Sequence, residues 1–281
     1  MKQTISACMV VYNEESLISR CLESIKDLVD EIIVVHDGAC SDQTLSIATQ
    51  YGAKIFVREH GGSCEAHRVF SFEQATSDWI FMIDADEYIQ TQNISQIKEM
   101  VKSNEYDAYA YNWPIYNGKE YMRGAYANKT KTVLVRKSRM YYIAVTHEAL
   151  GTYGKLQTRE DIRLEHKPVH YSFTFHALYK KLFPWGRIQA KQIVCVEDMP
   201  QFNIKHLETN LHYLYYNSYR SKPVYMTIKL MVYDFWQTAI QGSLLFSSPE
   251  NWKIFCIKQF TYIHLGISII RYKHQTDSTA S

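Results

Sequence analysis

The sequence predicts an α/β fold in which a mostly parallel sheet is flanked by helices. Through the first 100 residues, short apolar runs rich in β-branched residues alternate with segments whose apolar residues recur at helical spacing. Several runs are apolar at every position, as expected of strands covered on both faces. Acidic residues follow directly after two of the runs, which is typical of a ligand site at the carboxyl edge of a parallel sheet.

The individual elements can be placed by apolar spacing and by the turn residues between them. The strand candidates are residues 5–11, 31–35, 54–57, 79–83, 106–113, 121–126 and 132–136. The helix candidates are residues 14–28, 44–48, 64–75 and 94–102. Because the two types alternate, we expect β-α units whose strands share one sheet.

A helical region rich in Tyr and Phe follows the predicted sheet. Residues 173–196 and 225–272 have helical patterns, with prolines at their boundaries. We therefore divide the chain into an α/β domain at residues 1–172 and a helical extension at residues 173–281. Residues 254–273 mix apolar and basic side chains, which fits either an interfacial membrane helix or an ordinary core helix.

Composition excludes several classes of protein. With 46% hydrophobic residues, the 281-residue chain can bury a substantial core. The net charge of +2 and the scattered Lys and Arg argue against a nucleic-acid partner. Six widely spaced cysteines without a Cys-x-x-Cys pair favour reduced thiols in a cytoplasm. The apolar run at residues 5–11 is too short for a signal-peptide core, so we interpret it as a buried strand.

The strongest chemical signal is the turn Asp84-Ala85-Asp86-Glu87, which ends an apolar strand. Carboxylate oxygens suit Mg²⁺ or Mn²⁺, which can also bind the phosphates of a ligand. Alternatively, Asp84 or Asp86 caps a following helix. A second acidic turn, from Asp37 to Asp42, follows the strand at residues 31–35 and should reach the same sheet edge. Two converging acidic turns favour the metal site over helix caps.

Three segments of the sequence together resemble the family 2 glycosyltransferases of the GT-A fold. They are Val10-Val11-Tyr12-Asn13-Glu14-Glu15, residues 31–44 around His36-Asp37-Gly38, and residues 75–87 ending in Asp84-Ala85-Asp86-Glu87. The segments occur in the family's order and spacing across about the first 90 residues. The resemblance implies a nucleotide-sugar donor, expected to be a UDP-sugar, and a bound Mg²⁺ or Mn²⁺.

The resemblance also implies roles for individual residues. The nucleotide pocket is lined by Tyr12, Asn13 and Glu14, and the base is bound by Asp37. Arg68 approaches the base or phosphate, Asp84 contacts the ribose or sugar, and Asp86 ligates the metal. The alternatives are a turn residue for Asn13 and a solvated surface charge for Arg68.

Three further positions near the donor are open to other interpretations. Asp42 is either a donor ligand or a helix cap. Ala39 stands where the family usually has Gly, and Val69 stands where Asn is common. We therefore expect the loops near the donor to differ from the family's usual geometry.

Two carboxylates are candidates for the base that deprotonates the acceptor hydroxyl. The segment around His147-Glu148, followed by His166 to Tyr171, resembles the lipopolysaccharide-core glucosyltransferase-like branch and favours Glu148. Asp161 instead resembles the acidic pair that supplies the base in other members. His147 or His170 either completes the metal or phosphate shell or is an ordinary core or surface histidine.

We therefore expect an inverting, metal-dependent glycosyltransferase that adds one sugar to a cell-envelope glycan or glycolipid. It would work in the cytoplasm, in contact with the inner face of the cell membrane. One alternative is a sugar nucleotidyltransferase, although the acidic Glu14-Glu15 replaces the basic phosphate loop such an enzyme needs. Another is a non-catalytic sugar-nucleotide-binding protein of the same fold.

Overall fold

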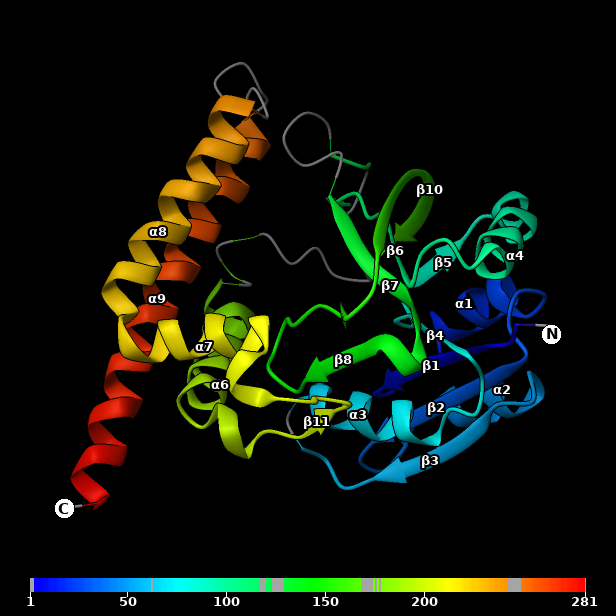
Figure 1. Ribbon diagram of the computed structural model, residues 1–281, viewed down its shortest axis with the longest axis horizontal. Helices are drawn as coiled ribbons and strands as arrows, with labels where there is room; N and C mark the ends of the chain where they lie inside the picture. Colours follow the sequence, from blue (N-terminus) through cyan, green and yellow to red (C-terminus); the bar gives the residue numbers. More distant parts are fainter. Residues whose placement is uncertain are drawn as a thin grey trace.

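The computed structural model describes residues 3–61, 63–116, 120–122, 129–167, 174, 176, 178–241 and 249–280. Its N-terminal half alternates strands and helices (Figure 1). The elements are β1 (Ile5–Val11), α1 (Ile18–Ile25), β2 (Glu31–Asp37), α2 (Thr44–Gln50), β3 (Lys54–Arg58), α3 (Glu65–Gln74), β4 (Trp79–Met82), β5 (Glu87–Ile89) and α4 (Ile94–Ser103). The predicted β-α units are therefore present in the predicted order.

The main sheet extends beyond these units by three strands, β6 (Ala108–Asn112), β7 (Thr130–Arg136) and β10 (Leu156–His166). Within the described residues its order is β3-β2-β1-β4-β7-β6-β10-β5. The pairs among β3, β2, β1 and β4 are parallel, as is β6 with β10. Only residues 83–86 separate β4 from β5, yet β5 pairs with β10 at the far end of the order. The sheet must therefore curl, so that β10 returns to the turn after β4.

Both faces of the sheet are buried, and alternation along the strands divides the core in two. Ala7, Met9 and Val11 of β1 face α1, whose buried residues Ile18, Cys21, Leu22 and Ile25 recur at helical spacing. Cys8 of β1 and Ile33 and Val35 of β2 face Val69 and Phe72 of α3 on the other side. The uninterrupted apolar runs of the sequence reflect this two-sided burial.

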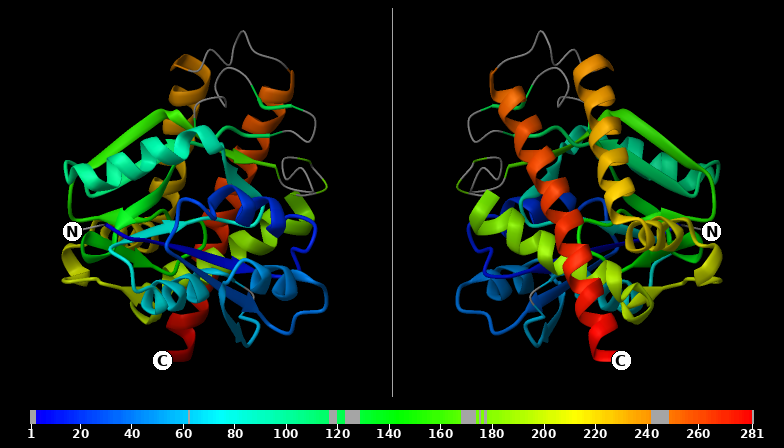
Figure 2. Two further views of the ribbon diagram at one scale, coloured as in Figure 1. Left: turned by 90° about the vertical axis from the view of Figure 1, so that its right-hand side faces the viewer. Right: turned by 90° about the vertical axis from the view of Figure 1, so that its left-hand side faces the viewer.

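The helical extension packs against one side of the sheet domain (Figures 1 and 2). Its elements are a π-helical turn (Leu178–Leu182), α6 (Phe183–Val194), α7 (Leu211–Ser221), α8 (Pro223–Phe235), a second π-helical turn (Trp236–Gln241) and α9 (Pro249–Ala280). A small sheet of β11 (Gln201–Phe202), β8 (Met140–Ile143) and β9 (Gly151–Thr152) joins the two parts. Ile143, the last residue of β8, and Val145 enter the same core as Ile193, Tyr219 and Leu265, so the extension is fixed to the domain.

The predicted fold class of a mostly parallel α/β sheet with helices and a C-terminal helical extension is confirmed. The helix predicted at residues 14–28 is shorter, because residues 14–17 form the turn that leaves the sheet edge. β5 and β8–β11 were not predicted. The boundary at residues 172 and 173, and residues 123–126 of the strand predicted at 121–126, lie outside the described residues. In the described part of the chain, no helix has the length and apolar character needed to cross a membrane.

Candidate functional site

Three loops converge where β1, β2 and β4 end, on the side of the sheet domain that faces the extension (Figure 1). Asn13 begins the first loop with a positive φ of 52°. Its backbone N–H donates to His36 Nε2 at 3.3 Å, and its Oδ1 accepts from the Ser41 N–H at 2.9 Å. Asn13 is thus a turn residue that also ties the first loop to the second.

The second loop, after β2, is held by local hydrogen bonds. Gly38 has a φ of 94°, a conformation that a side chain rarely tolerates, and its N–H donates to the Arg58 carbonyl. Asp42 Oδ1 accepts from the Thr44 N–H at 2.9 Å, so Asp42 holds the start of α2 from the position before its N-cap residue, Gln43. Ala39 has no positive φ, so its substitution for glycine introduces no backbone strain.

Asp37 is only 6% exposed and lies among two histidines and a backbone amide. Its Oδ1 is 2.9 Å from both the Gly61 N–H and His67 Nε2, and its Oδ2 is 3.0 Å from His60 Nδ1. Tyr12, 55% exposed, lies over His60 with 5.5 Å between ring centroids. An exposed aromatic ring next to a fixed carboxylate can stack on a planar base that donates a hydrogen bond.

The third loop, Asp84 to Glu87, is a hydrogen-bonded turn that leads into β5, so neither Asp84 nor Asp86 caps a helix. Asp84 binds two cations: Oδ1 accepts from Arg68 Nη2 at 2.7 Å and Oδ2 from Lys131 Nζ at 2.8 Å. Burial raises the pKa of Asp84, but Arg68 and Lys131 outweigh it and hold the pKa below its usual range. Arg68 is therefore not a solvated surface charge.

Glu87 is fully buried beneath this turn. Its Oε1 accepts from Lys131 Nζ at 2.6 Å and from the Trp113 indole N–H at 2.7 Å. Its Oε2 accepts from the Asp84 N–H at 3.0 Å. Glu87 thus fixes the backbone of the turn, and Lys131 neutralises both carboxylates.

Asp86 differs from its two acidic neighbours because neither Lys nor Arg is recorded as an ion-pair partner among the described residues. Its Oδ2 lies 2.9 Å from His166 Nε2, and its side chain is 23% exposed. The His166 ring lies 4.6 Å from the Trp113 ring. The Lys167 N–H donates to the Asp86 carbonyl at 3.1 Å. The curl of the sheet is what delivers His166, at the end of β10, to this turn.

The donor set at Asp86 fits a divalent cation. A carboxylate and an imidazole suit Mn²⁺, and Mg²⁺ is commonly held by one or two carboxylates together with substrate phosphates. No set of three or more His, Cys, Asp or Glu side chains forms a complete cage within the described residues. Asp86 and His166 would therefore hold the ion together with ligand oxygens and water.

Glu14 adds a further carboxyl group to this edge. Burial, together with the charges of Asp86, Asp42 and Asp84, raises the pKa of Glu14 to about 7. Its backbone N–H donates to Thr44 Oγ1 at 2.6 Å, which fixes the loop but leaves the carboxyl group to respond to bound charge.

The Val145–Glu148 segment lies where α3 and α6 meet. Gln192 Oε1 of α6 accepts from both the N–H and the hydroxyl of Thr146 at 2.8 Å, and Gln189 donates to the Thr146 carbonyl at 2.7 Å. The His147 N–H donates to Glu65 Oε1 of α3 at 3.3 Å, and His147 has a φ of 67°. Hydrogen bonds from two helices therefore fix this segment, including the positive φ of His147.

Glu148 turns its side chain toward α7. Burial raises the pKa of Glu148 to about 8, although the Ala149 N–H donates to Oε1 at 2.9 Å. His212 Nδ1 lies 3.1 Å from the same oxygen, and burial lowers the pKa of His212 to about 4. Both groups are thus mainly uncharged near pH 7. A carboxyl group with a pKa near neutrality is suited to proton transfer.

Asp161 lies in a different environment, at the bulge of β10. Arg159 donates to its two oxygens at 2.9 and 2.7 Å, and Gln96 of α4 donates to Oδ2 at 2.8 Å. The hydrogen bonds from Arg159 lower the pKa of Asp161 to about 2. α4 lies at the end of the molecule opposite the extension (Figure 1). These contacts direct Asp161 away from the three converging loops.

Several site residues were missed by the sequence analysis. Lys131 belongs to a strand with no acidic motif, and only the pairing of β7 beside β4 brings it to Asp84. His60 and His67 had no sequence signal that linked them to Asp37. Val69, expected to alter the donor loop, is instead buried in the core with Phe72. His170 lies outside the described residues.

Basic and aromatic side chains continue this edge beyond Asp86. The Lys167 ammonium lies 5.7 to 5.9 Å from the ring centroids of Tyr88, Tyr116 and Tyr121. The Arg163 guanidinium lies 3.8 Å from the Tyr121 ring. Glu165 Oε2 is buried without a hydrogen-bond partner among the described groups. Aromatic faces next to unsatisfied polar atoms can accommodate a saccharide.

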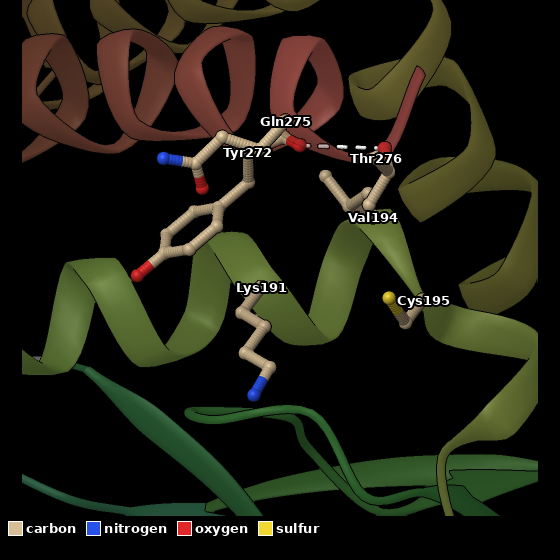
Figure 3. A pocket seen from close by; sticks show the side chains of 6 residues that line it. All are labelled: Lys191, Val194, Cys195, Tyr272, Gln275 and Thr276. Carbon is tan, nitrogen blue, oxygen red and sulfur yellow. Dashed lines mark hydrogen bonds between the residues drawn. The ribbon is translucent and has the colours of Figure 1, made fainter. Parts of the chain in front are cut away.

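Two surface hollows among the described residues lie on the extension rather than at this edge. One lies between α6 and α9 and is lined by Lys191, Val194, Cys195, Tyr272, Gln275 and Thr276 (Figure 3). The other lies on α8. Neither contains a residue of the converging loops, so we assign the site by its chemistry instead.

Comparison with known proteins identifies the family. Residues 6–183 match the family described as Glycosyl transferase family 2. This match covers more than half of the chain, which therefore belongs to the family 2 glycosyltransferases. The family and the curled α/β sheet together confirm the expected GT-A fold class.

Curated relatives match over a part of their length. An uncharacterized glycosyltransferase of Rickettsia felis is 36% identical over 107 residues, which cover 38% of this chain and 37% of that protein. A TPR repeat-containing protein of Synechococcus elongatus is 38% identical over 101 residues, covering 36% of this chain and 25% of that protein. The matches thus span between a quarter and 37% of these relatives.

A solved structure is similar over most of the chain. S. aureus TarS 1-349 in complex with UDP-GlcNAc has 13% sequence identity and a TM-score of 0.48, with 97% of this chain and 92% of that chain covered. A likeness at this level transfers neither a ligand nor a mechanism to this chain.

Proposed function

We propose that this chain transfers one sugar from a UDP-sugar to a hydroxyl of a cell-envelope glycan or glycolipid, with inversion at the anomeric carbon. The observation that carries the proposal is the convergence of three loops around Asp86, whose only recorded ion-pair partner in the described structure is His166. Asp84 and Glu87, by contrast, are already neutralised by Arg68 and Lys131. This edge therefore has a negatively charged position suited to a cation beside a fixed scaffold.

The donor would lie across the ends of β1, β2 and β4. Tyr12 stacks on the nucleotide base, Asp37 accepts a hydrogen bond from it, and Asn13 and Glu14 line the pocket. Arg68 and Lys131 keep Asp84 ionised, and Asp84 contacts the ribose or sugar. Asp86 and His166 would hold Mg²⁺ or Mn²⁺, which would supply positive charge to neutralise the leaving diphosphate.

The acceptor would enter from the side of the extension. Its hydroxyl oxygen attacks the anomeric carbon from the face opposite the diphosphate, and Glu148 takes the hydroxyl proton. The bond between the anomeric carbon and the diphosphate oxygen breaks, and its electron pair leaves with that oxygen. Glu148 is supported by its raised pKa, and its neighbour His212, whose pKa burial lowers to about 4, brings no positive charge that would lower the pKa of Glu148 near pH 7. Asp161 is the less favoured base, because Arg159 and Gln96 occupy its carboxylate.

Two features support a saccharide acceptor. The rings of Tyr88, Tyr116 and Tyr121 lie around Lys167 directly after the strand that carries His166. The His147-Glu148 segment is similar to that of the lipopolysaccharide-core glucosyltransferase-like branch, which suggests a cell-envelope acceptor. Such acceptors are found at a membrane, so we place the reaction at the inner face of the cell membrane.

The first test is thermal stability against UDP, GDP, ADP, CDP and TDP, each with and without Mn²⁺. A ligand at about 100 times its dissociation constant adds roughly 2.7 kcal/mol, which raises the melting temperature of a protein of this size by several degrees. We expect UDP to stabilise the wild type only with Mn²⁺, and Asp86→Ala to lose that response. Glu99→Ala, an exposed acidic position on α4, is the matched control and should respond like the wild type.

If another nucleotide stabilises the protein in place of UDP, the sugar donor carries that nucleotide. If no nucleotide stabilises the wild type with or without metal, the proposed donor site is wrong. If UDP and Mn²⁺ bind but no sugar is transferred to any acceptor, the chain is a non-catalytic sugar-nucleotide-binding protein of this family.

A further inference from the structure

The outer face of α8 is apolar and exposed. Seven large hydrophobic side chains on α8 and the π-helical turn after it are between 45% and 61% exposed: Val224, Tyr225, Ile228, Val232, Tyr233, Phe235 and Trp236. Lys229 lies among them and is also exposed. These eight residues form the outer α8 face. A surface helix of a soluble protein usually presents polar side chains to water, so a continuous apolar face indicates an interaction surface.

The other side of α8 is already used for packing. Met226 is buried with Leu265 and Ile269 of α9. Gly266 of α9 lies so close to Thr227 that a side chain at this position would overlap its hydroxyl group. The right-hand view of Figure 2 shows α8 and α9 side by side on the face turned away from the sheet. Among the described residues, no other part of the chain covers the outer α8 face.

α9 contributes less exposed apolar surface than its sequence suggests. Residues 254–273 were one candidate for a membrane-surface helix, yet Ile254, Ile257, Leu265 and Ile269 are buried. Phe260, Ile263 and Ile267 remain between 39% and 50% exposed in a narrow stripe. α9 is thus largely a core helix, and the wider apolar surface belongs to α8.

Charge distinguishes the partners that could cover the outer α8 face. Between residues 211 and 276 the sequence has seven Lys or Arg and only two Asp or Glu. One of the two acids, Asp234, is turned inward and binds Lys258 and Gln259. Lys222 and Lys229 are exposed beside the apolar side chains. Two of the seven basic residues are paired with acids, Lys258 with Asp234 and Arg220 with Glu197, but the exposed Lys222 and Lys229 give this face a positive charge.

A second copy of the chain would not satisfy this arrangement. In a twofold dimer the same patch meets itself, so Lys222 and Lys229 would face a surface of the same sign. A membrane with anionic lipids offers the complementary charge, and its headgroup region accepts amphipathic Tyr and Trp rings next to buried aliphatic side chains.

We infer that the outer α8 face docks on an anionic lipid membrane surface, with its apolar side chains in the headgroup region and Lys222 and Lys229 against the lipid phosphates. This docking depends on the surface of α8 and not on the proposed transfer chemistry. It deepens the proposed function by naming the part of the molecule that holds it at a membrane acceptor.

The test is flotation of the full chain with vesicles of phosphatidylcholine alone or with added phosphatidylglycerol. We expect the chain to float only with the anionic vesicles, and less so as salt screens the lysines. Ile228→Asp combined with Val232→Asp should lower the vesicle-bound to free ratio at least about tenfold, because two inserted apolar side chains become charged. Lys222→Glu combined with Lys229→Glu should weaken binding to anionic vesicles in the same direction.

Val57→Asp is the matched control, because Val57 is 56% exposed but lies on β3, at the opposite edge of the sheet. It should float like the wild type. All variants should keep the UDP and Mn²⁺ thermal shift, so failure of docking is separable from failure of the proposed function. Unchanged flotation of the Ile228/Val232 variant, or equal binding to neutral vesicles, would overturn the inference.

The oligomeric state, measured by light scattering without lipid, distinguishes a membrane from a second copy of the chain as the partner of the outer α8 face. We expect the wild type and the Ile228/Val232 variant to have the same oligomeric state, whether it is a monomer or a larger assembly. A wild-type dimer that this variant converts to a monomer, together with absent vesicle binding, would show that a second copy covers the outer α8 face.

Discussion

Asp84, in the turn after β4, and Glu148, which follows β8, are carboxyl groups in opposite electrostatic environments. In the turn, Arg68 and Lys131 hold Asp84 ionised, and Glu87 also binds Lys131. At Glu148, no Lys or Arg is recorded as an ion-pair partner among the described residues, and burial raises the pKa to about 8. Burial raises the pKa of Glu87 as well, so the separation of pKa values is between Asp84 and Glu148. Two carboxyl groups whose pKa values are pushed apart are suited to different roles, one binding charge and the other transferring a proton. This difference is the reason we propose charge binding for the turn and base catalysis for Glu148.

The largest expected effect tests the turn as the charge-binding region. Asp86→Ala should lower kcat/KM about 1000-fold, because it removes the carboxylate proposed to hold the cation at the leaving group. The melting temperature without ligand should change little, since Asp86 is partly exposed and lies outside the ion-pair network of Lys131. Activity assays with Mn²⁺ titration and a thermal melt measure both quantities. If Asp86→Ala kept the wild-type kcat/KM, the proposal that this turn holds the metal ion would be wrong.

The next effect tests the turn as a folded scaffold. Lys131→Met should lower the free energy of unfolding by about 3 kcal/mol, because it leaves the buried Glu87 and the adjacent Asp84 without this cation. Lys102→Met is the control: its ion pair with Glu99 is exposed, and its loss should cost about 0.5 kcal/mol or less. Urea unfolding followed by circular dichroism gives both values. Equal losses would show that Lys131 does not stabilise the turn.

A smaller effect compares the two candidate bases directly. Glu148→Gln should lower kcat about 100-fold with little change in donor KM, because the amide keeps the shape but cannot accept the proton. Asp161→Asn should stay within about threefold of wild type, since its carboxylate is bound by Arg159 and lies by α4. The opposite ranking in steady-state assays would move the base to Asp161.

The smallest effect concerns pH and stability at Glu148. Its folded pKa, about 8, is raised above the ordinary value of 4.5, so it favours the fold while protonated and loses that contribution as pH rises from 4.5 to about 8. Glu148→Gln has no carboxyl group to ionise and should gain a few degrees in melting temperature relative to wild type across this interval. Melting curves between pH 5 and pH 9 measure the difference. A constant difference would mean that the carboxyl group is not buried in solution.

The same ionisation predicts the pH dependence of the reaction. A base must be unprotonated, so kcat should rise with pH through about 8 and then level off. In the Asp161→Asn variant the profile should be unchanged. A kcat that is flat from pH 6 to pH 9 would contradict Glu148 as the base.

The N-terminal sheet could be predicted because its signals are local. Apolar runs at β1, β2 and β4 are buried on both faces, and the acidic residues that follow them must emerge at the same edge of a parallel sheet. The candidates Asp37, Asp84 and Asp86 follow from that geometry alone. The interfacial character of residues 254–273 was harder to judge, because a mixed apolar and basic helix looks the same whether it packs on a neighbour or on a membrane.

By itself, the sequence determined the α/β fold class, the order of the first strands and helices, and the acidic loops at their ends, because periodicity and turn chemistry act over a few residues. The tertiary structure decided which carboxylate of the acidic turn is not paired with Lys or Arg among the described residues. The curl of the sheet brings His166 to Asp86, and the pairing of β7 with β4 brings Lys131 to Asp84. It also decided that α8 rather than α9 carries the wider exposed apolar face. Burial and charge pairing depend on residues far apart in the chain, and no local pattern specifies them.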